Sequence, residues 1–160
     1  MITGDNGSGK STLLRHLLGQ IKVPKEKLIY LPQELSADAG TEVLDQVREL
    51  PNEQLGHVMN VVRRLGSDPG RLLDSQHPSP GEMRKLLLAL GTTSEPHLLI
   101  LDEPTNHLDL PSLNALESAL GDCPCALIVV SHDQRFLDQL GGTAWHLDSD
   151  SAGNSTLLLN

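Results

Sequence analysis

The sequence predicts an α/β fold in which a mostly parallel sheet is covered by helices on both faces. Apolar runs of strand length alternate with segments of helical periodicity, and the clearest runs cover residues 28–31, 98–101 and 126–130. Runs without polar alternation are typical of strands that are buried on both faces. A further strand is expected at the start of the chain, and residues 143–147 and 156–159 are expected to form a hairpin.

Composition narrows the class of protein. The chain has 160 residues, of which 38% are hydrophobic and 2% aromatic, so it is the size of one domain with an aliphatic core. No apolar run is long enough to span a membrane, and no signal peptide is recognisable. Cys123 and Cys125 are too close for a useful disulfide loop and lack the partners of a zinc site, which indicates a reduced, cytoplasmic chain.

The formal net charge of −9 is unevenly distributed along the chain. It is +3 over residues 1–27, −3 over residues 28–87 and −9 over residues 88–160. This distribution excludes an electrostatic nucleic-acid binder, so any contact with RNA must be local or come from another part of the protein. A magnesium nucleotide would offset some of the acidic cluster around residues 102–109.

Helices are predicted from apolar periodicity and from capping residues. The first helix is expected from Lys10 to Gly19, with Gly19 as its C-cap. Thr41 and Asn52 are expected to cap two further helices, and residues 67–78 are expected to form a loop.

Two later helix starts are marked by capping residues. Ser79 suits the N-cap, Pro80 suits the first helical position, and Glu82 completes a capping box. A further helix is expected to begin near Asp109 or Pro111.

The glycine-rich segment from Gly4 to Thr12 fits the pattern G-x-x-x-x-G-K-[ST] of a phosphate-binding loop. Glycines let backbone N–H groups converge on phosphate oxygens, and the helix that follows directs its positive dipole end at the same anion. Lys10 is suited to the β and γ phosphates, and the Ser11 hydroxyl is suited to Mg²⁺. The alternative is a glycine-rich turn that enters an ordinary helix. The loop residues expected to bind nucleotide are Gly4, Asn6, Gly7, Ser8, Gly9, Lys10, Ser11 and Thr12.

Polar residues follow the three clearest apolar runs. Gln33 comes just after the first run, Asp102 and Glu103 come after the second, and His132 comes after the third. The carboxyl ends of parallel strands share one edge of a sheet, where ligands bind. The sequence therefore predicts one site that is built from all four residues and the glycine-rich loop.

Each of these residues has a chemical role and a structural alternative. Asp102 is expected to hold Mg²⁺ directly or through water. Glu103 is expected to face away from Asp102 and to act as general base on a water molecule, or to be an ordinary strand-end carboxylate. Gln33 can bind Mg²⁺ or the attacking water, or only hydrogen-bond a loop. His132 can contact the γ-phosphate or serve a structural role.

Six motifs resemble, in order and spacing, those of an ATP-binding cassette (ABC) domain. They are the Walker A loop, the Q-loop at Gln33, the signature at residues 79–82, Walker B at residues 98–103, the D-loop at residues 104–109 and the H-loop at residues 131–133. The run Glu-Pro-Thr-Asn-His-Leu-Asp at residues 103–109, the glutamate after the signature glycine, and the run Ser-His-Asp-Gln-Arg-Phe-Leu resemble the ABC-F branch. The likeness is greatest to the second of the two cassettes that an ABC-F chain usually holds.

The resemblance implies a single P-loop ATPase domain that binds ATP with Mg²⁺ and hydrolyses it. Residues 1–33 and 88–160 would form the nucleotide-binding core, and residues 34–87 a small helical subdomain that ends at the signature helix. Family cassettes clamp head to tail, so a second ABC cassette is implied as a partner.

Each ATP in such a clamp lies between the Walker A loop of one cassette and the signature of the other. Ser79, Gly81 and Asp109 are therefore implied to be nucleotide-binding residues, and a helix N-terminus such as the one at Ser79 is a suitable anion site. The alternative is that residues 79–82 form only a helix cap.

ABC-F proteins are soluble and, where understood, act on ribosomes as translation or antibiotic-resistance factors. The resemblance implies an ATP-driven clamp that contacts the ribosome through other parts of the protein and does not insert into a membrane. The alternatives are the ATP-binding subunit of a membrane ABC transporter and a catalytically weak remnant. Family cassettes carry an antiparallel β subdomain upstream of Walker A, where this chain has only residues 1–3, so truncation at the start is expected.

Overall fold

The computed structural model describes all residues except 35–36, 76–77, 94, 107, 150–153 and 160. The described part contains one six-stranded sheet with the strand order β2-β3-β4-β1-β5-β6. The strands are β1 (Ile2–Gly4), β2 (Leu28–Leu31), β3 (Leu98–Asp102), β4 (Ala126–Val130), β5 (Trp145–Ser149) and β6 (Ser155–Leu159). The helices are α1 (Lys10–Gln20), a 3-10 turn η1 (Lys25–Lys27), α2 (Ala37–Arg48), α3 (Asn52–Arg64), α4 (Pro69–Asp74), α5 (Pro80–Thr93), α6 (Leu110–Gly121) and α7 (Gln134–Leu140).

The predicted mostly parallel sheet is confirmed. Strands β2, β3, β4, β1 and β5 pair in parallel, and β6 pairs antiparallel with β5 as the expected hairpin. Every residue of β3 is buried, which agrees with its uninterrupted apolar run. The register places Asp102 of β3 beside Val130 of β4, so these two strands end together at one edge.

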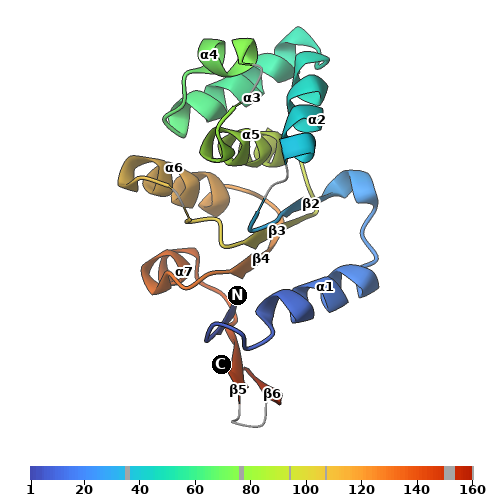
Figure 1. The fold of residues 1–160 in the computed structure, drawn as a ribbon, viewed down its shortest axis with the longest axis vertical. Coiled ribbons are helices and arrows are strands. Elements are labelled where there is room, and N and C mark those ends of the chain that lie inside the picture. Colours follow the sequence, from blue (N-terminus) through green and yellow to red (C-terminus); the bar gives the residue numbers. More distant parts are fainter. Residues whose placement is uncertain (35–36, 76–77, 94, 107, 150–153, 160) are drawn as a thin grey trace.

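Helices cover both faces of the sheet (Figure 1). On one face, Leu14 of α1 packs in a cluster with Ile2 and Ile100. On the other face, a larger cluster joins α5, α6 and α7 to the alternate side chains of the strands. The buried members of that larger cluster are Leu31, Leu65, Leu88, Leu99, Leu101, Leu116, Leu120, Val129, Phe136 and Leu137. Alternation of buried side chains along β3 explains why one strand supplies both clusters.

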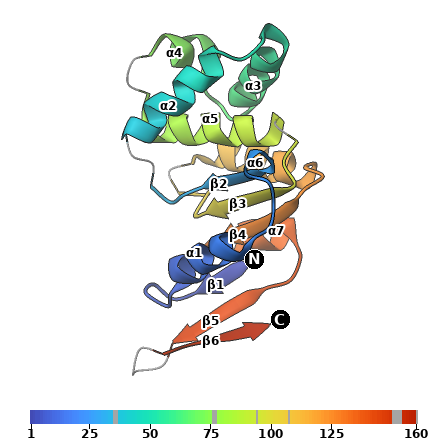
Figure 2. The ribbon, with the colours of Figure 1, turned by 90° about the vertical axis from the view of Figure 1, so that its right-hand side faces the viewer.

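Beyond the β2 edge, α2, α3, α4 and α5 form a separate layer of helices (Figure 2). These helices share their own apolar cluster, whose buried members are Leu44, Val47, Val58, Val62, Leu72, Met83, Leu86 and Ala89. Helix α5 belongs to both layers, because Leu88 packs in the cluster against the sheet while Leu86 packs among the helices.

Three predicted helix ends differ from the structure. Gly19 is not a C-cap, since α1 continues to Gln20 and the N–H of Ile21 donates to the Leu17 carbonyl at 3.0 Å. Helix α2 begins four residues before Thr41, because the preceding Ala-Asp-Ala-Gly segment accepts helical geometry. Pro51 takes the N-cap position of α3, which was predicted for Asn52.

The predicted loop over residues 67–78 is also partly wrong, because it contains α4. Asp68 Oδ1 accepts a hydrogen bond from Arg71 N at 3.1 Å, and Pro69 follows it at the first helical position. Asp followed by Pro is a recognised helix start. Leu72 is fully buried in the helical layer, so tertiary packing stabilises this short helix. None of the helices in the described ranges is both long and apolar enough to cross a membrane.

Candidate functional site

The carboxyl ends of the parallel strands surround one pocket of about 700 Å³. Its walls come from the loops that follow β1, β2, β3 and β4. The residues that line it are Asn6, Gly7, Gly9, Lys10, Ser11, Thr12, Gln33, Asp102, Glu103, Thr105, Asn106, His132 and Asp133. The structure therefore brings together most of the glycine-rich loop and all four polar strand-end residues that the sequence singled out. Of the loop residues predicted to bind nucleotide, Gly4 and Ser8 do not line the pocket.

The glycine-rich loop has a backbone that only glycine adopts easily. Gly4 has φ +140°, and a Cβ atom at this position would lie 2.4 Å from the carbonyl oxygen of Leu147 in β5. Gly9, the N-cap of α1, has φ +92°. The hairpin also holds the loop, since Ser155 Oγ donates to the Ser8 carbonyl at 2.8 Å. Strand pairing and a side-chain contact thus fix the loop in place.

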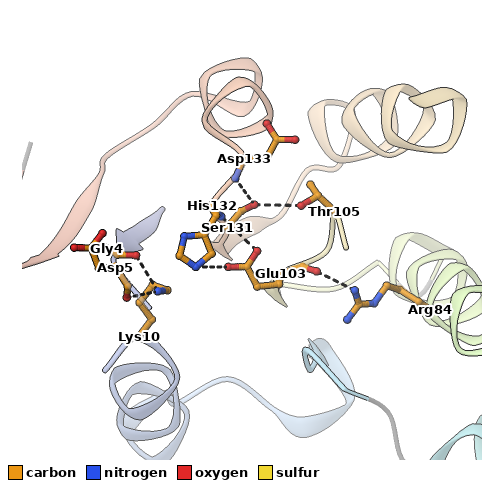
Figure 3. Close-up of polar contacts among 9 residues, drawn as sticks. All are labelled: Gly4, Asp5, Lys10, Arg84, Glu103, Thr105, Ser131, His132 and Asp133. Atoms are coloured by element: carbon orange, nitrogen blue, oxygen red, sulfur yellow. Dashed lines mark hydrogen bonds and ion pairs between the residues drawn. The ribbon is translucent and has the colours of Figure 1, made fainter. Parts of the chain in front are cut away.

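Lys10 is the first residue of α1 and is 8% exposed. Its ammonium group donates to the carbonyls of Gly4 at 2.9 Å and Asp5 at 2.8 Å (Figure 3). Since these acceptors carry no formal charge, the lysine presents its positive charge beside a helix N-terminus, which suits an anion. Ser8 Oγ is buried and has no hydrogen-bond partner within the described residues.

Asp102 ends β3 and is 4% exposed, so its carboxylate is a buried polar group in the pocket wall. Burial raises the pKa of Asp102 above its ordinary value, and the charges of Lys10, Arg84 and Arg15 oppose this rise. A buried carboxylate with a cation nearby is the arrangement that a metal–phosphate complex completes.

Glu103 departs from the predicted geometry. The chain leaves the extended conformation at this residue, which has φ +49°, so Asp102 and Glu103 line the same pocket and do not face opposite sides of a strand. Glu103 Oε2 accepts a hydrogen bond from the backbone N–H of His132 at 3.3 Å, and Oε1 lies 3.4 Å from His132 Nε2 (Figure 3). Within the described residues Oε1 is buried and accepts no hydrogen bond.

The pKa of Glu103 is raised chiefly by burial, against the opposing effects of the His132 ring and backbone N–H. A carboxylate with a raised pKa and one oxygen that accepts no hydrogen bond within the described residues is suited to accept a proton from water. His132 and Gln33 are both exposed at the pocket, so each can reach a bound ligand.

The loops after β3 and β4 also supply three lining residues that belong to the D-loop and H-loop motifs but were given no individual role from the sequence: Thr105, Asn106 and Asp133. Ser131 Oγ accepts a hydrogen bond from Asp133 N at 3.1 Å and lies 3.4 Å from Thr105 Oγ1 (Figure 3). This contact joins the two loops. Proximity in sequence to Glu103 and His132 was the available signal for these residues.

The predicted capping box at the start of α5 is confirmed. Glu82 Oε2 accepts hydrogen bonds from Ser79 N at 2.8 Å and Ser79 Oγ at 2.7 Å, and Glu82 N donates to Ser79 Oγ at 3.3 Å. These bonds lower the pKa of Glu82. In the structure, Ser79 therefore serves as a helix cap, which the sequence analysis gave as the alternative to nucleotide binding.

Ser79, Gly81 and Asp109 are not among the residues that line the pocket. Asp109 is the N-cap of α6, and its Oδ1 accepts a hydrogen bond from Ser112 N at 3.0 Å. His107, a member of the D-loop motif, lies outside the described residues.

The donor set of the pocket fits a magnesium nucleotide. The Ser11 hydroxyl and the buried Asp102 carboxylate are hard oxygen ligands, and both line the same pocket as Lys10. Mg²⁺ commonly takes one or two such protein ligands and completes its shell with phosphate oxygens and water. The buried Ser8 hydroxyl, which has no hydrogen-bond partner among the residues that the structure describes, lies in the loop that would surround the phosphates.

Comparison with known proteins agrees with the family that the six sequence motifs resemble. A family model described as "ABC transporter" matches residues 1–106. The chain is similar to the ribosome protection protein VmlR of Bacillus subtilis, with 40% identity over 149 residues that cover 86% of this chain and 27% of VmlR. It is also similar to ABC transporter F family member 2 of Dictyostelium discoideum, with 31% identity over 163 residues that cover 92% of this chain and 27% of that protein.

Among solved structures, the ATP-binding subunit of an ABC transporter has the same fold, with a TM-score of 0.71 at 20% identity over 91% of this chain and 72% of that one. The chain spans about a quarter of the length of the two curated relatives. The family model covers well over half of the chain, and the fold and pocket agree with it. The chain therefore belongs to the ATP-binding cassette (ABC) family of ATPase domains, and its curated relatives include ABC-F proteins.

Proposed function

We propose that this chain binds and hydrolyses ATP as a cassette of an ABC-F protein. One observation carries the proposal. A single pocket collects a glycine-rich loop with a buried lysine, two buried carboxylates and a histidine from three different strand ends, and a glutamine from a fourth. Phosphoryl transfer to water needs an anion cradle, a metal ligand and a base, and these residues supply all three.

The phosphate side of the pocket would be formed by the loop and by α1. Backbone N–H groups of residues 4–12 and the Lys10 ammonium would hold the phosphates, with the dipole of α1 adding to the attraction. Ser11 and Asp102 would hold Mg²⁺, which neutralises charge on the phosphate oxygens when it is bound. Gln33 lines the pocket and would contact either the metal or the attacking water.

Glu103 would be the general base. As the water oxygen bonds to the γ-phosphorus, its proton would pass to the Glu103 carboxylate, and the bond from phosphorus to the bridging oxygen of ADP would break. This role is supported by the burial-raised pKa of Glu103 and by its Oε1 atom, which accepts no hydrogen bond in the described part of the chain. His132, 3.4 Å from Oε1, would orient the carboxylate and lie beside the γ-phosphate.

Ser79, Gly81 and Asp109 would serve the nucleotide of a second cassette. None of them lines the pocket of this chain, while the start of α5 presents a capped helix N-terminus that is exposed at Ser79. We propose that α2 to α5, which have their own apolar cluster, form the small helical subdomain of residues 34–87 beside a core of residues 1–33 and 88–160.

The ribosome is the proposed target of the full-length protein in the cytoplasm. The relative that supports this step is the one named as a ribosome protection protein. With a net charge of −9, this chain is a poor ligand for RNA, so the RNA contacts would come from other parts of the protein. No specific observation favours a membrane subunit as the partner.

The test is steady-state ATP turnover by the full-length protein and its Glu103→Gln variant. Glu103→Gln should lower kcat by about 10²–10⁴-fold, because it removes the base, and should leave ATP affinity within a few-fold. Glu117→Gln is a matched control. Glu117 also has a buried Oε1 that makes no hydrogen bond to any described residue, yet it lies in α6 away from the pocket lining. Equal turnover in Glu103→Gln and wild type would refute the assignment of the base.

A further inference from the structure

Arg84 lies in the second turn of α5, in the helix whose first turn carries the capping box. It is 4% exposed and does not line the pocket. Figure 3 shows its guanidinium group extending from α5 toward the backbone of Glu103. A buried arginine inside a protein requires partners for its five N–H donors, and here these partners define its role.

Within the described residues, the Arg84 side chain makes four hydrogen bonds, and all four go to backbone carbonyls of loops that form the pocket. Nη1 donates to the carbonyls of Glu103 at 2.9 Å and Asn106 at 3.3 Å. Nη2 donates to the carbonyls of Pro32 at 3.0 Å and Gln33 at a short distance. One side chain of α5 thus holds both the loop after β2 and the loop after β3.

The shape of the guanidinium group makes this arrangement specific. Its nitrogens lie in one plane at fixed angles, so two of them can reach different loops at the same time. A lysine has a single nitrogen and cannot span both pairs of carbonyls. Burial lowers the pKa of Arg84, and the nearby charges of Asp102 and Glu103 oppose that effect and favour the charged form.

The contact with Glu103 matters most, because this residue adopts an unfavourable backbone conformation at φ +49°. Such a conformation persists only where the surroundings hold it. The N–H of Glu103 donates to the Val130 carbonyl at 2.8 Å, and its carbonyl accepts from Arg84 at 2.9 Å. The backbone is therefore fixed on both sides of the Cα atom, which sets the direction of the side chain into the pocket.

We propose that Arg84 is a positioning residue for ATP hydrolysis, which holds Glu103 and Gln33 in place relative to helix α5. The inference rests on the function proposed above. Because the four bonds link α5 to both loops, a movement of this helix displaces the base and the glutamine together. The position of the capped start of α5 is thereby coupled to the placement of Glu103 and Gln33 for hydrolysis, without any contact between Arg84 and the nucleotide.

The test compares Arg84→Lys with wild type in the full-length protein. The variant keeps the charge but loses the two-loop geometry, so kcat should fall by about 10–100-fold, as expected for a displacement of roughly 1 Å at the base. KM should stay within about two-fold, because the glycine loop and Lys10 are untouched. If Arg84 only stabilised the fold, Arg84→Lys would lower the melting temperature but would leave both kcat and KM of the folded protein at wild-type values.

Arg48→Lys is the matched control. Arg48 of α2 also donates to backbone carbonyls, those of Leu73 and Ser75, but it lies away from the pocket lining. It should leave both kcat and KM at wild-type values. Rates are normalised to the nucleotide-bound fraction, and Arg84→Gln, which retains an amide donor, replaces Arg84→Lys if the latter does not fold.

Two outcomes are distinguishable. If wild type hydrolyses ATP and the Arg84 variants turn over at the wild-type rate, the inference is overturned while the proposed function stands. If wild type itself neither binds nor hydrolyses ATP, the proposed function fails and takes the inference with it.

Discussion

Replacing Gly4 by alanine tests whether the glycine-rich loop is held by its contact with β5. The new Cβ atom would lie 2.4 Å from the Leu147 carbonyl oxygen and 2.8 Å from Ser8 Oγ. Gly4 and Leu147 are direct partners in the parallel pairing of β1 with β5, so neither backbone can move away without loss of the pairing.

The expected loss of folding stability in Gly4→Ala follows from two unfavourable terms. A φ of +140° is strained for any residue with a Cβ atom, at about 1–3 kcal/mol. Overpacking against a fixed backbone costs about 1–3 kcal/mol more. The alanine also reduces the conformational entropy of the unfolded chain, which offsets about 0.4–1 kcal/mol of this loss. The net loss of about 1–6 kcal/mol is a large part of the roughly 5–15 kcal/mol stability of a typical domain.

Urea denaturation at 25 °C, with two other glycine-to-alanine variants, measures this loss. Gly7 has φ +83° but nothing within 4 Å of its Cβ position, so Gly7→Ala should carry only the conformational cost. Gly19 lies in α1 with open space around it, so Gly19→Ala should stabilise by up to about 1 kcal/mol. The expected order of stability is Gly19→Ala, wild type, Gly7→Ala, Gly4→Ala. Gly4→Ala as stable as Gly7→Ala would refute the steric reasoning.

Three further predictions concern the cap and the pocket. Ser79→Ala removes the hydroxyl of the capping box and should destabilise the chain by about 1 kcal/mol in urea denaturation, and an unchanged midpoint would contradict the cap. The pKa of Asp102 is raised in the folded state, so ionisation of this carboxyl lowers the stability as pH rises from its ordinary pKa through the raised value. Asp102→Asn should therefore raise the melting temperature of the ligand-free chain at pH 7.5, and the difference from wild type should close toward pH 4. A difference that does not change with pH would argue against burial as the cause. The His132 ring lowers the pKa of Glu103, so His132→Ala should raise that pKa. The acid limb of the pH profile of ATP turnover should then move to higher pH, because the base must be deprotonated. An acid limb that moves to lower pH would contradict the interaction between His132 and Glu103.

Local patterns sufficed to predict much of the fold and of the pocket. The uninterrupted apolar runs predicted β2, β3 and β4, and the rule that parallel strands share an edge brought Gln33, Asp102 and His132 to one place. The capping box at Ser79 is encoded within four residues, which is why it could be predicted. These features depend on periodicity and on neighbours in sequence.

Features that depend on tertiary contacts could not be predicted in the same way. Helix α4 is stabilised by the burial of Leu72 against other helices, and this outweighed the turn-like composition of its segment. The backbone conformation of Glu103 breaks the strand alternation that was used to place it opposite Asp102. Arg84 gave no signal, since a charged residue in a helix shows nothing of the four carbonyls that surround it after folding.

Calorimetric titration with Mg·ATP measures whether the pocket binds nucleotide through its glycine-rich loop, with wild type, Lys10→Ala and Lys22→Ala compared side by side. Lys10 is buried beside the glycine loop, whereas Lys22 is exposed and does not line the pocket. Loss of a charge-assisted contact worth about 1.5–3 kcal/mol should weaken binding by roughly 10–100-fold in Lys10→Ala. We expect one saturable site in the wild-type form of this chain, the same affinity in Lys22→Ala and that loss in Lys10→Ala. Absence of binding in wild type, or equal affinity in all three proteins, would contradict it.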